Sequence, residues 1–437
     1  MEEGPRYFEL DRVIAEDPEY YCQGGYCPVN IGDRVGKRFK IVHKLGYGGF
    51  ATVWLAREED KSRYVALKIV AADHSETYET LPEIAPLLQN FPSFFLAEHE
   101  RFFVDSQNGR HLCQVFPVLG PTLDALTDFH HRLYPEHVRD FAWQIASAVE
   151  IMHSNGLYLT TRNIALGLSK RLDHLSEKKI RSLFPIKKQK IKLRSEDNPK
   201  SESRAPNYAV QAIDLTRLPS TYLSSKLYIL DFDQAYSSQN PPRSLLGIAP
   251  RYLAPESIFE LRKGPPADVW ALGCLIFRIR CGLDIYEDLP ETPSNVISRM
   301  YGVLGGHLLE HWKTVLFDDY GWPAHDGRQE GVEYNDFSGD YDFPYTSLWE
   351  YVKKTVDPKR PKNVDNEVGI LNLCRYLPTD AFHQGQLEQG WATKNAACIS
   401  RKEADSFYDL MRRVFEYDPD RRITASDMLA HPWFKGK

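Results

Sequence analysis

The sequence predicts an α+β protein whose first part is rich in β-strands and whose second part is mainly helical. Three apolar stretches between Phe39 and Val70, the first two joined by a glycine turn, predict an antiparallel meander. Apolar residues between Val138 and Met152 recur with the spacing of one buried helix face. With 437 residues, the chain is long enough for two lobes with insertions.

Composition excludes several classes of protein. Hydrophobic residues make up 42% of the chain, enough for a sizeable core, and a net charge of −6 does not favour nucleic-acid binding. The seven cysteines contain no C-x-x-C pair, which indicates a reducing compartment rather than a disulfide framework. The N-terminus has no apolar run, and the apolar run 269–277 is too short to span a bilayer. We therefore expect a soluble intracellular protein without a membrane partner.

Four further segments carry helix patterns. Residues 77–89 are compatible with a short helix, although two prolines restrict its start. The apolar segment 267–279 predicts a buried helix, and 403–415 and 424–431 predict the last helices of the chain. We find no internal repeat.

Two segments interrupt these patterns. Residues 169–226 include eight Lys or Arg and no acid between Lys178 and Arg194, and we interpret them as a largely mobile spacer. Within it, the basic run 187–194 is either a solvated part of the spacer, which we favour, or a nuclear import signal. Residues 317–343 hold eight Asp or Glu against one Arg and form a second, acidic insert.

The turn at Leu45–Val53 has the pattern G-x-G-x-F-x-x-V. Gly46 and Gly48 would let backbone amides approach phosphate oxygens, and Val53 would pack on a purine. An ordinary hairpin also carries such a turn, so the pattern is weak evidence alone. Its weight increases because Lys68 follows Gly48 by 20 residues, on the third predicted strand.

Further motifs follow in order along the chain. Asp231 opens a D-F-D triplet directly after an apolar strand. An A-P-E triplet ending at Glu256 comes next, followed by Asp268 in D-V-W-A-L-G. Near the end, D-P-D-R-R-I-T contains Arg422, which the resemblance given next implies as the ion partner of Glu256.

This series of motifs resembles that of eukaryotic protein kinases from about Arg38 to Phe434. Residues 16–33 and 111–120 are similar to the segment before the kinase domain and to the hinge of SR-protein kinases, which phosphorylate serines in Arg/Ser-rich splicing factors. The spacer sequence and the D-F-D variant resemble those of divergent fungal members of the SR-protein kinase family. The resemblance implies a bilobal fold with these parts: an N-terminal extension 1–37, an N-lobe 38–119 and a C-lobe 120–437 that holds the spacer 169–226 and a late insert 285–400.

The resemblance also implies ATP and Mg²⁺ as cofactors and assigns roles to single residues. Lys68 would pair with the α- and β-phosphates, with Glu83 as its helix partner and Glu79 as the alternative. Asn163 and Asp231 would hold Mg²⁺. The nucleotide would contact Leu45, Gly46, Gly48, Val53, Val65, Ala66, Lys68, Phe116, Val118 and Leu119.

The catalytic loop departs from the family pattern. A kinase loop reads H-x-D-x-x-x-x-N, but five residues before Asn163 stands Tyr158, and no catalytic base is found. Either Tyr158 replaces the Asp in register, or three residues are deleted after Tyr158; both flanks fit the deletion, which we prefer. Arg162 would place positive charge near the γ-phosphate or bond the loop backbone.

The function implied is that of an SR-protein-kinase-like serine/threonine kinase that binds Mg-ATP and transfers phosphate weakly or not at all. The alternative is a pseudokinase that binds Arg/Ser-rich partners, with the acidic insert as the docking surface. An active kinase hidden by a faulty gene model predicts three extra residues after Tyr158 in the transcript. We expect a monomer in the cytoplasm and, if the basic run is an import signal, in the nucleus.

Overall fold

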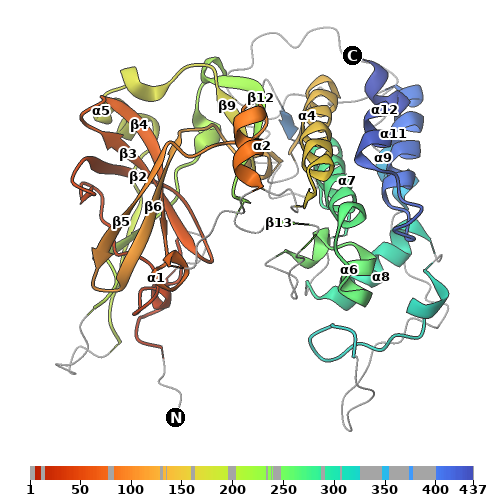
Figure 1. Ribbon diagram of the computed structural model, residues 1–437, viewed down its shortest axis with the longest axis horizontal. Helices are drawn as coiled ribbons and strands as arrows, with labels where there is room; N and C mark the ends of the chain where they lie inside the picture. Colours follow the sequence, from red (N-terminus) through yellow and green to blue (C-terminus); the bar gives the residue numbers. More distant parts are fainter. Residues whose placement is uncertain are drawn as a thin grey trace. The chain divides into compact units, whose positions relative to one another are not determined.

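The computed structural model describes residues 5–10, 15–76, 83–127, 131–133, 135–158, 163–194, 203–232, 235–237, 239, 248–286, 291–305, 308–324, 347–353, 374–376 and 400–436. The chain divides into two compact units, shown in Figure 1. Unit 1 comprises Met1–Thr80, Leu96–Pro121 and Gly167–Ser224, and unit 2 comprises Leu81–Phe95, Thr122–Leu166 and Ser225–Lys437. Unit 1 is rich in strands and unit 2 is mainly helical, so the predicted α+β class is confirmed.

Unit 1 is built on a six-stranded antiparallel sheet with the strand order β1-β2-β3-β4-β6-β5. The predicted meander forms its centre, because β2, β3 and β4 pair in sequence through short turns. Strand β6 then adds to the far side of β4 and pairs with β5. The bounds are β1 Arg34–Val35, β2 Phe39–Gly48, β3 Ala51–Glu58, β4 Arg63–Val70, α1 Ala72–Ser75, β5 Glu100–Ser106 and β6 Gly109–Pro117.

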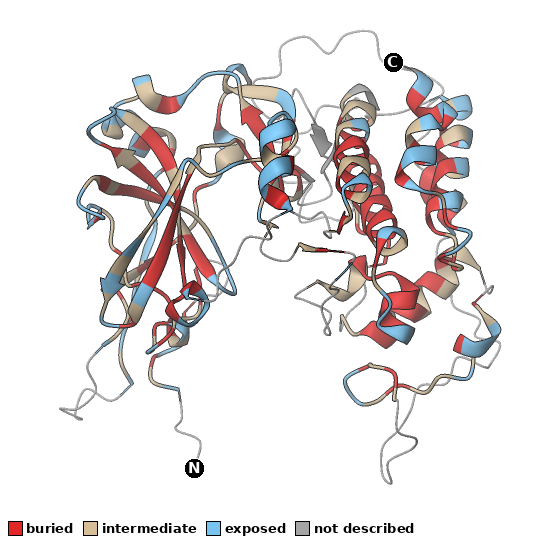
Figure 2. Ribbon diagram, viewed as in Figure 1, coloured by how far each residue is buried: buried red, intermediate tan, exposed pale blue. Residues whose placement is uncertain are grey.

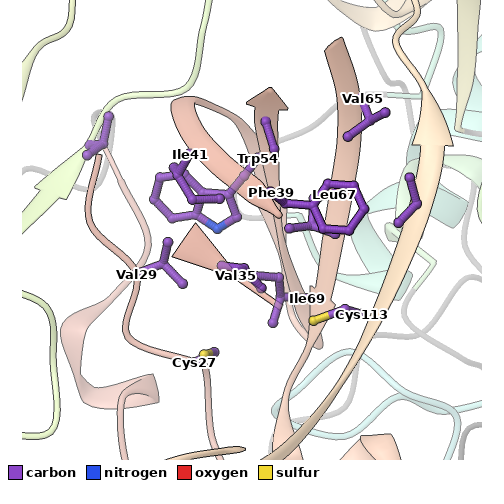
Figure 3. Close-up of a cluster of buried hydrophobic side chains, with 13 residues drawn as sticks. Cys27, Val29, Val35, Phe39, Ile41, Trp54, Val65, Leu67, Ile69 and Cys113 are labelled. Carbon is purple, nitrogen blue, oxygen red and sulfur yellow. The ribbon is translucent and has the colours of Figure 1, made fainter. Parts of the chain in front are cut away.

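One face of this sheet carries an apolar core, drawn in Figure 3. Alternation along β4 places Val65, Leu67 and Ile69 in this core, whereas Ala66 and Lys68 on the opposite face are only partly buried. Because alternate residues of a strand face opposite sides, the Val65 side chain does not share the face of Lys68, contrary to the expectation that both contact the nucleotide. The core also takes in three residues from outside the sheet: Cys27, Val29 and Val210.

The predicted spacer 169–226 differs from the prediction, because its described residues fold and belong almost entirely to unit 1. Helix α5, Glu177–Leu183, begins at the capping residue Ser176 and buries Ile180 in one apolar cluster with Val42 of β2 and Leu55 of β3. Ile213 also donates its amide to the Lys44 carbonyl at 2.8 Å. The other elements are 3₁₀ turns at Leu172–His174, Leu215–Arg217 and Ser220–Tyr222 and the paired strands β10 Lys188–Lys190 and β11 Tyr208–Val210.

The basic run 187–194 is held in this folded part. The Lys188 ammonium lies 3.7 Å from the centre of the Tyr208 ring, and Ile191 is buried. The Arg194 guanidinium donates to the Tyr7 carbonyl at 2.7 Å. These contacts agree with a structural role for the run, although its reading as an import signal stays untested.

Buried histidines give unit 1 a predicted acid sensitivity. His111 on β6 is fully buried, lies 3.0 Å from the Val70 carbonyl through Nδ1 and 2.8 Å from Ser106 Oγ through Nε2, and burial lowers its pKa below 6.5. The unfolded chain therefore binds more protons just below pH 6.5, and the free energy of unfolding falls as the pH drops through this window. In urea unfolding at about pH 7.5 and about pH 5.5, we expect His111→Gln to reduce the loss of stability. An unchanged pH dependence would contradict this, whatever the absolute stability of the variant.

Unit 2 packs helices around α7, Pro265–Cys281. This helix begins with Pro265 in its first turn and is capped at its end by Gly282. Gly282 has a left-handed φ of 76° and donates its backbone N–H to the Arg278 carbonyl at 2.7 Å. Thirteen of the 17 residues of α7 are buried (Figure 2), as its largely apolar sequence predicts. No helix among the described residues is long and apolar enough to cross a membrane.

The helices predicted around 77–89, 138–152, 403–415 and 424–431 are present with different ends, and helices and strands that the sequence did not predict accompany them. Their bounds are α2 Ile84–Asn90, α3 Leu123–Thr127, β7 His131–Leu133, α4 Pro135–Ser154, β8 Leu157–Tyr158, β9 Ile164–Leu168, β12 Leu223–Ile229, β13 Tyr236–Ser237, α6 Pro255–Glu260, α8 Pro293–Leu304, α9 Leu348–Lys353, β14 Cys374–Tyr376, α11 Arg401–Val414 and α12 Ala425–Ala430, with 3₁₀ turns at Pro250–Tyr252, Glu310–Trp312 and Pro432–Gly436.

The boundaries of the two units differ from the predicted lobe boundaries at two segments. Residues 81–95, expected in the N-lobe, belong to unit 2, and most of the spacer, expected in the C-lobe, belongs to unit 1. Within unit 2, Ile229 on β12 donates its amide to the Phe94 carbonyl at 2.8 Å. Most of the acidic insert, 325–343, and most of the predicted late insert 285–400 lie outside the described residues.

Candidate functional site

The glycine-rich turn forms the tip of the β2–β3 hairpin in unit 1. Gly46 pairs with Val53 and Gly48 with Ala51 in the ladder, so the predicted motif lies on a hairpin, whose register shifts between Lys44 and Gly46. A side-chain carbon at Gly46 or Gly48 would meet no other atom within 4 Å, which leaves the backbone of the tip open to a ligand. Phe50 at the tip is 46% exposed.

The sheet face opposite the core gathers several predicted nucleotide contacts in unit 1. Val53 lies directly across from Lys68, and Ala66 lies across from Phe116, so side chains of each pair share a face. All four are partly buried. This face therefore brings an apolar surface and one ammonium group together, as a nucleotide requires.

The predicted hinge follows β6. Phe116 is still in the ladder with β4, and the chain leaves the strand after Pro117. Val118 and Leu45 are partly buried and pack against the apolar cluster that holds Ile180. Leu119 is also partly buried. The structure thus places the hinge residues in unit 1, at the edge of the face that carries Lys68.

The two predicted metal ligands meet in unit 2. The Asn163 side-chain amide donates to an Asp231 carboxylate oxygen at 3.3 Å, and Leu230 donates its amide to the Asn163 carbonyl at 2.7 Å. Asp231 is exposed and has a φ of 62°, a left-handed conformation that a non-glycine residue adopts rarely. The sequence separates these residues by 68 positions, and the fold brings their side chains into contact.

The residue after Asp231 is anchored in the same unit. The Phe232 ring packs edge-on against buried Phe95, with ring centres 5.8 Å apart. Ile229 on β12 also donates a hydrogen bond to the Phe94 carbonyl. The strand that leads to Asp231 is therefore held beside the segment that follows α2. Asp233 lies outside the described residues.

The start of the catalytic loop is a short strand. Tyr158 ends β8 and pairs with Tyr236 on β13, and the Tyr158 ring also lies 5.6 Å from the His153 ring. His153 Nε2 lies 3.0 Å from an Asp268 carboxylate oxygen in a nearly buried pair. The sequence showed Asp268 and His153 separately but carried no signal of this contact. Residues 159–162, which include Arg162, lie outside the described residues.

One predicted structural contact is confirmed. Arg422 donates two hydrogen bonds to Glu256, at 2.6 and 2.9 Å, and both side chains are buried. Arg422 also donates to the Pro266 carbonyl at 2.8 Å, which ties the A-P-E segment to the start of α7.

The partner of Lys68 stays a prediction. Glu83 is exposed and lies at the start of α2 in unit 2, whereas Lys68 belongs to unit 1. Glu79, the alternative, lies outside the described residues. No group of three or more His, Cys, Asp or Glu side chains that could hold a metal ion occurs in the described part of the chain. A site of two protein ligands is nevertheless typical of Mg²⁺, which usually keeps water and takes substrate phosphates as further ligands.

Comparison with known proteins agrees with this arrangement. The protein kinase domain family matches residues 39–160 and 222–434, and the stretch between them corresponds to most of the predicted spacer. Serine/threonine-protein kinase spk-1 of Caenorhabditis elegans is 38% identical over 148 residues, 32% of this chain and 15% of that protein. SRSF protein kinase 3 of Mus musculus is 40% identical over 116 residues, 25% of this chain and 20% of that protein.

A longer alignment extends over nearly the whole chain. The probable serine/threonine-protein kinase clkA of Dictyostelium discoideum is 22% identical over 428 residues, 94% of this chain and 37% of that protein. The aligned parts thus span well under half the length of each of these relatives. The matched family covers more than half of the chain. The chain therefore belongs to the protein kinase domain family, and it is similar to serine/threonine kinases of the SR-protein kinase group.

Proposed function

We propose that this chain binds Mg-ATP and that, in the form given by its sequence, it transfers phosphate weakly or not at all. The observation that supports nucleotide and metal binding most directly is the contact between Asn163 and Asp231. A carboxylate and an amide side chain carry the oxygen ligands that Mg²⁺ prefers, and here the two side chains are neighbours. Lys68, on the same face as Val53, would pair with phosphate oxygens as a compact positive charge.

The weak point of the proposed reaction is proton transfer. Bound Mg²⁺ would supply charge stabilisation at the phosphates, but the attacking serine hydroxyl must also lose its proton. A positioned base contributes about 10²–10⁴-fold to such a rate. Tyr158 is held in β8 between His153 and Tyr236, which supports the reading that it ends the strand before a three-residue deletion.

The proposed substrates or partners are Arg/Ser-rich proteins. This proposal rests on the similarity to SRSF protein kinase 3 and on the acidic composition of 317–343, which would attract an Arg-rich peptide. If phosphoryl transfer is absent, the same surface would make the chain a binding module for these partners. The proposed location in the cytoplasm and nucleus rests on composition and on the basic run 187–194 alone.

Nucleotide binding is tested by Asp231→Asn. Loss of a residue that only supports a metal ligand typically weakens metal affinity about 10–100-fold, and we expect loss of a ligand itself to cost at least as much. Titration calorimetry with ATP should therefore show Mg²⁺-dependent binding by the unaltered protein and a weaker, Mg²⁺-insensitive response by the variant. Asp405→Asn, an exposed carboxylate on α11, is the matched control. Equal Mg-ATP affinity of the Asp231 variant and the unaltered protein would sink the assignment.

A further inference from the structure

A tyrosine from outside the sheet holds the tip of the glycine-rich hairpin. The Tyr26 hydroxyl donates a hydrogen bond to the Gly48 carbonyl. Tyr26 is buried, and burial raises the pKa of its phenol well above the usual value, so the hydroxyl stays protonated and able to donate. Tyr26 was not among the site residues predicted from the sequence, because it stands 22 positions before Gly48.

The segment that carries Tyr26 is itself firmly held within unit 1. The Tyr26 backbone N–H donates to the Tyr20 carbonyl at 2.9 Å. The Tyr26 backbone carbonyl accepts a hydrogen bond from the Asn108 side-chain amide at 2.7 Å. Its ring packs edge-on against buried Tyr21, with ring centres 5.6 Å apart. Asn108 lies in the turn between β5 and β6, so the sheet fixes the position of the Tyr26 hydroxyl.

A buried pair of charged side chains lies beside the same hairpin. Glu16 accepts hydrogen bonds from the Tyr21 hydroxyl and from the Lys44 ammonium, and both charged side chains are almost fully buried. Lys44 lies on β2 only two residues before Gly46. Residues 16–26 therefore anchor the hairpin at Lys44 as well as at its tip.

The other side of the turn has separate anchors. Ala71 donates its amide to the Phe50 carbonyl at 2.8 Å, and the Phe50 ring lies 4.5 Å from the His74 ring on α1. With Phe50 fixed, the remaining freedom lies in the glycine peptides before it, where the backbone has no side chain to restrict it. The bond from Tyr26 falls on one of these peptides.

The geometry of that peptide points to a role in ligand binding. In a planar trans peptide, the carbonyl and the following N–H point in opposite directions. Fixing the Gly48 carbonyl toward Tyr26 therefore fixes the Gly49 N–H on the opposite side. We propose that Tyr26 is a positioning residue, which orients the Gly49 amide as a hydrogen-bond donor for a phosphate group of the nucleotide. This inference rests on the proposed nucleotide binding and deepens it.

The test uses Tyr26→Phe in the full chain, with Tyr20→Phe as the matched control. The Tyr20 side chain belongs to the same segment, is 53% exposed, and its ring packs on Tyr26, so the control removes a hydroxyl while keeping the ring contacts. Loss of one neutral hydrogen bond predicts an ATP affinity lower by about 3- to 10-fold in Tyr26→Phe. Adenosine affinity, which involves no phosphate, should stay within about twofold.

Hydrogen exchange of the amides in 45–53, measured without nucleotide, gives an independent readout. Exchange should become faster in Tyr26→Phe and stay unchanged in Tyr20→Phe. Unchanged exchange, or an equal loss of ATP and adenosine affinity, would overturn the positioning role. If the unaltered protein binds no nucleotide, the proposed function fails, and the positioning role of Tyr26 fails with it. If the unaltered protein binds ATP and Tyr26→Phe binds it equally well, only the positioning role fails.

Discussion

Insertion of His-Gly-Asp after Tyr158 is expected to raise the kcat for phosphorylation of an Arg-Ser repeat peptide by about 10²–10⁴-fold. This is the contribution of a positioned general base, which the shortened loop lacks. The strand β8 already ends at Tyr158, and Asn163 already contacts Asp231, so the insertion falls between two elements that the structure holds in place. The measurement is steady-state turnover with Mg-ATP.

The control for this insertion is His-Gly-Asn. It restores the length of the loop without the carboxylate, so it separates loop geometry from proton transfer. We expect little gain from this control. Equal activation by both insertions would assign the defect to loop length, and no activation by either would show that the gap alone does not explain weak transfer.

Replacement of Arg422 by Leu is expected to lower the free energy of unfolding by about 3–5 kcal/mol. The change leaves Glu256 as a buried charge without its partner, which costs far more than the net worth of the pair. Arg422 is fully buried and also bonds backbone carbonyls, including that of Pro266, so little water would reach the unpaired carboxylate. Urea unfolding followed by circular dichroism gives the value.

The same substitution at Arg262 provides the comparison. Its ion pair with Asp420 has a similar distance, 2.6 Å, but its side chains are 43% and 74% exposed. An exposed pair is worth about 0–1 kcal/mol, so Arg262→Leu should change stability little. A loss at Arg422 no larger than the loss at Arg262 would contradict the role of the buried pair.

Local patterns predicted the parts of the fold that depend on local sequence. The meander 39–70 and the helix around Val138–Met152 have periods that leave one structural solution each, and both are present. The pairing of Glu256 with Arg422 was also predictable, because both belong to motifs whose contact the family shares. The placement of Asn163 beside Asp231 followed from the same motifs.

The spacer shows why other parts were not predictable. Its charged composition indicated mobility, yet isolated apolar residues such as Ile180 and Ile191 are buried against distant partners. A few such residues among many lysines do not produce a period, so the sequence carries no signal of the surface that covers them. The Tyr26–Gly48 and His153–Asp268 contacts were hidden for the same reason, since each joins residues whose proximity only the tertiary fold creates.

The central claim is that the chain keeps a metal and nucleotide site but lacks the group that takes the proton from the substrate hydroxyl. The most direct test is a single-turnover assay of the unaltered protein in excess over γ-labelled ATP, with Mg²⁺ and an Arg-Ser repeat peptide. The account predicts Mg²⁺-dependent binding of ATP, abolished by Asp231→Asn, with little or no labelled peptide. Rapid and complete transfer of label to the peptide by the unaltered protein would contradict it.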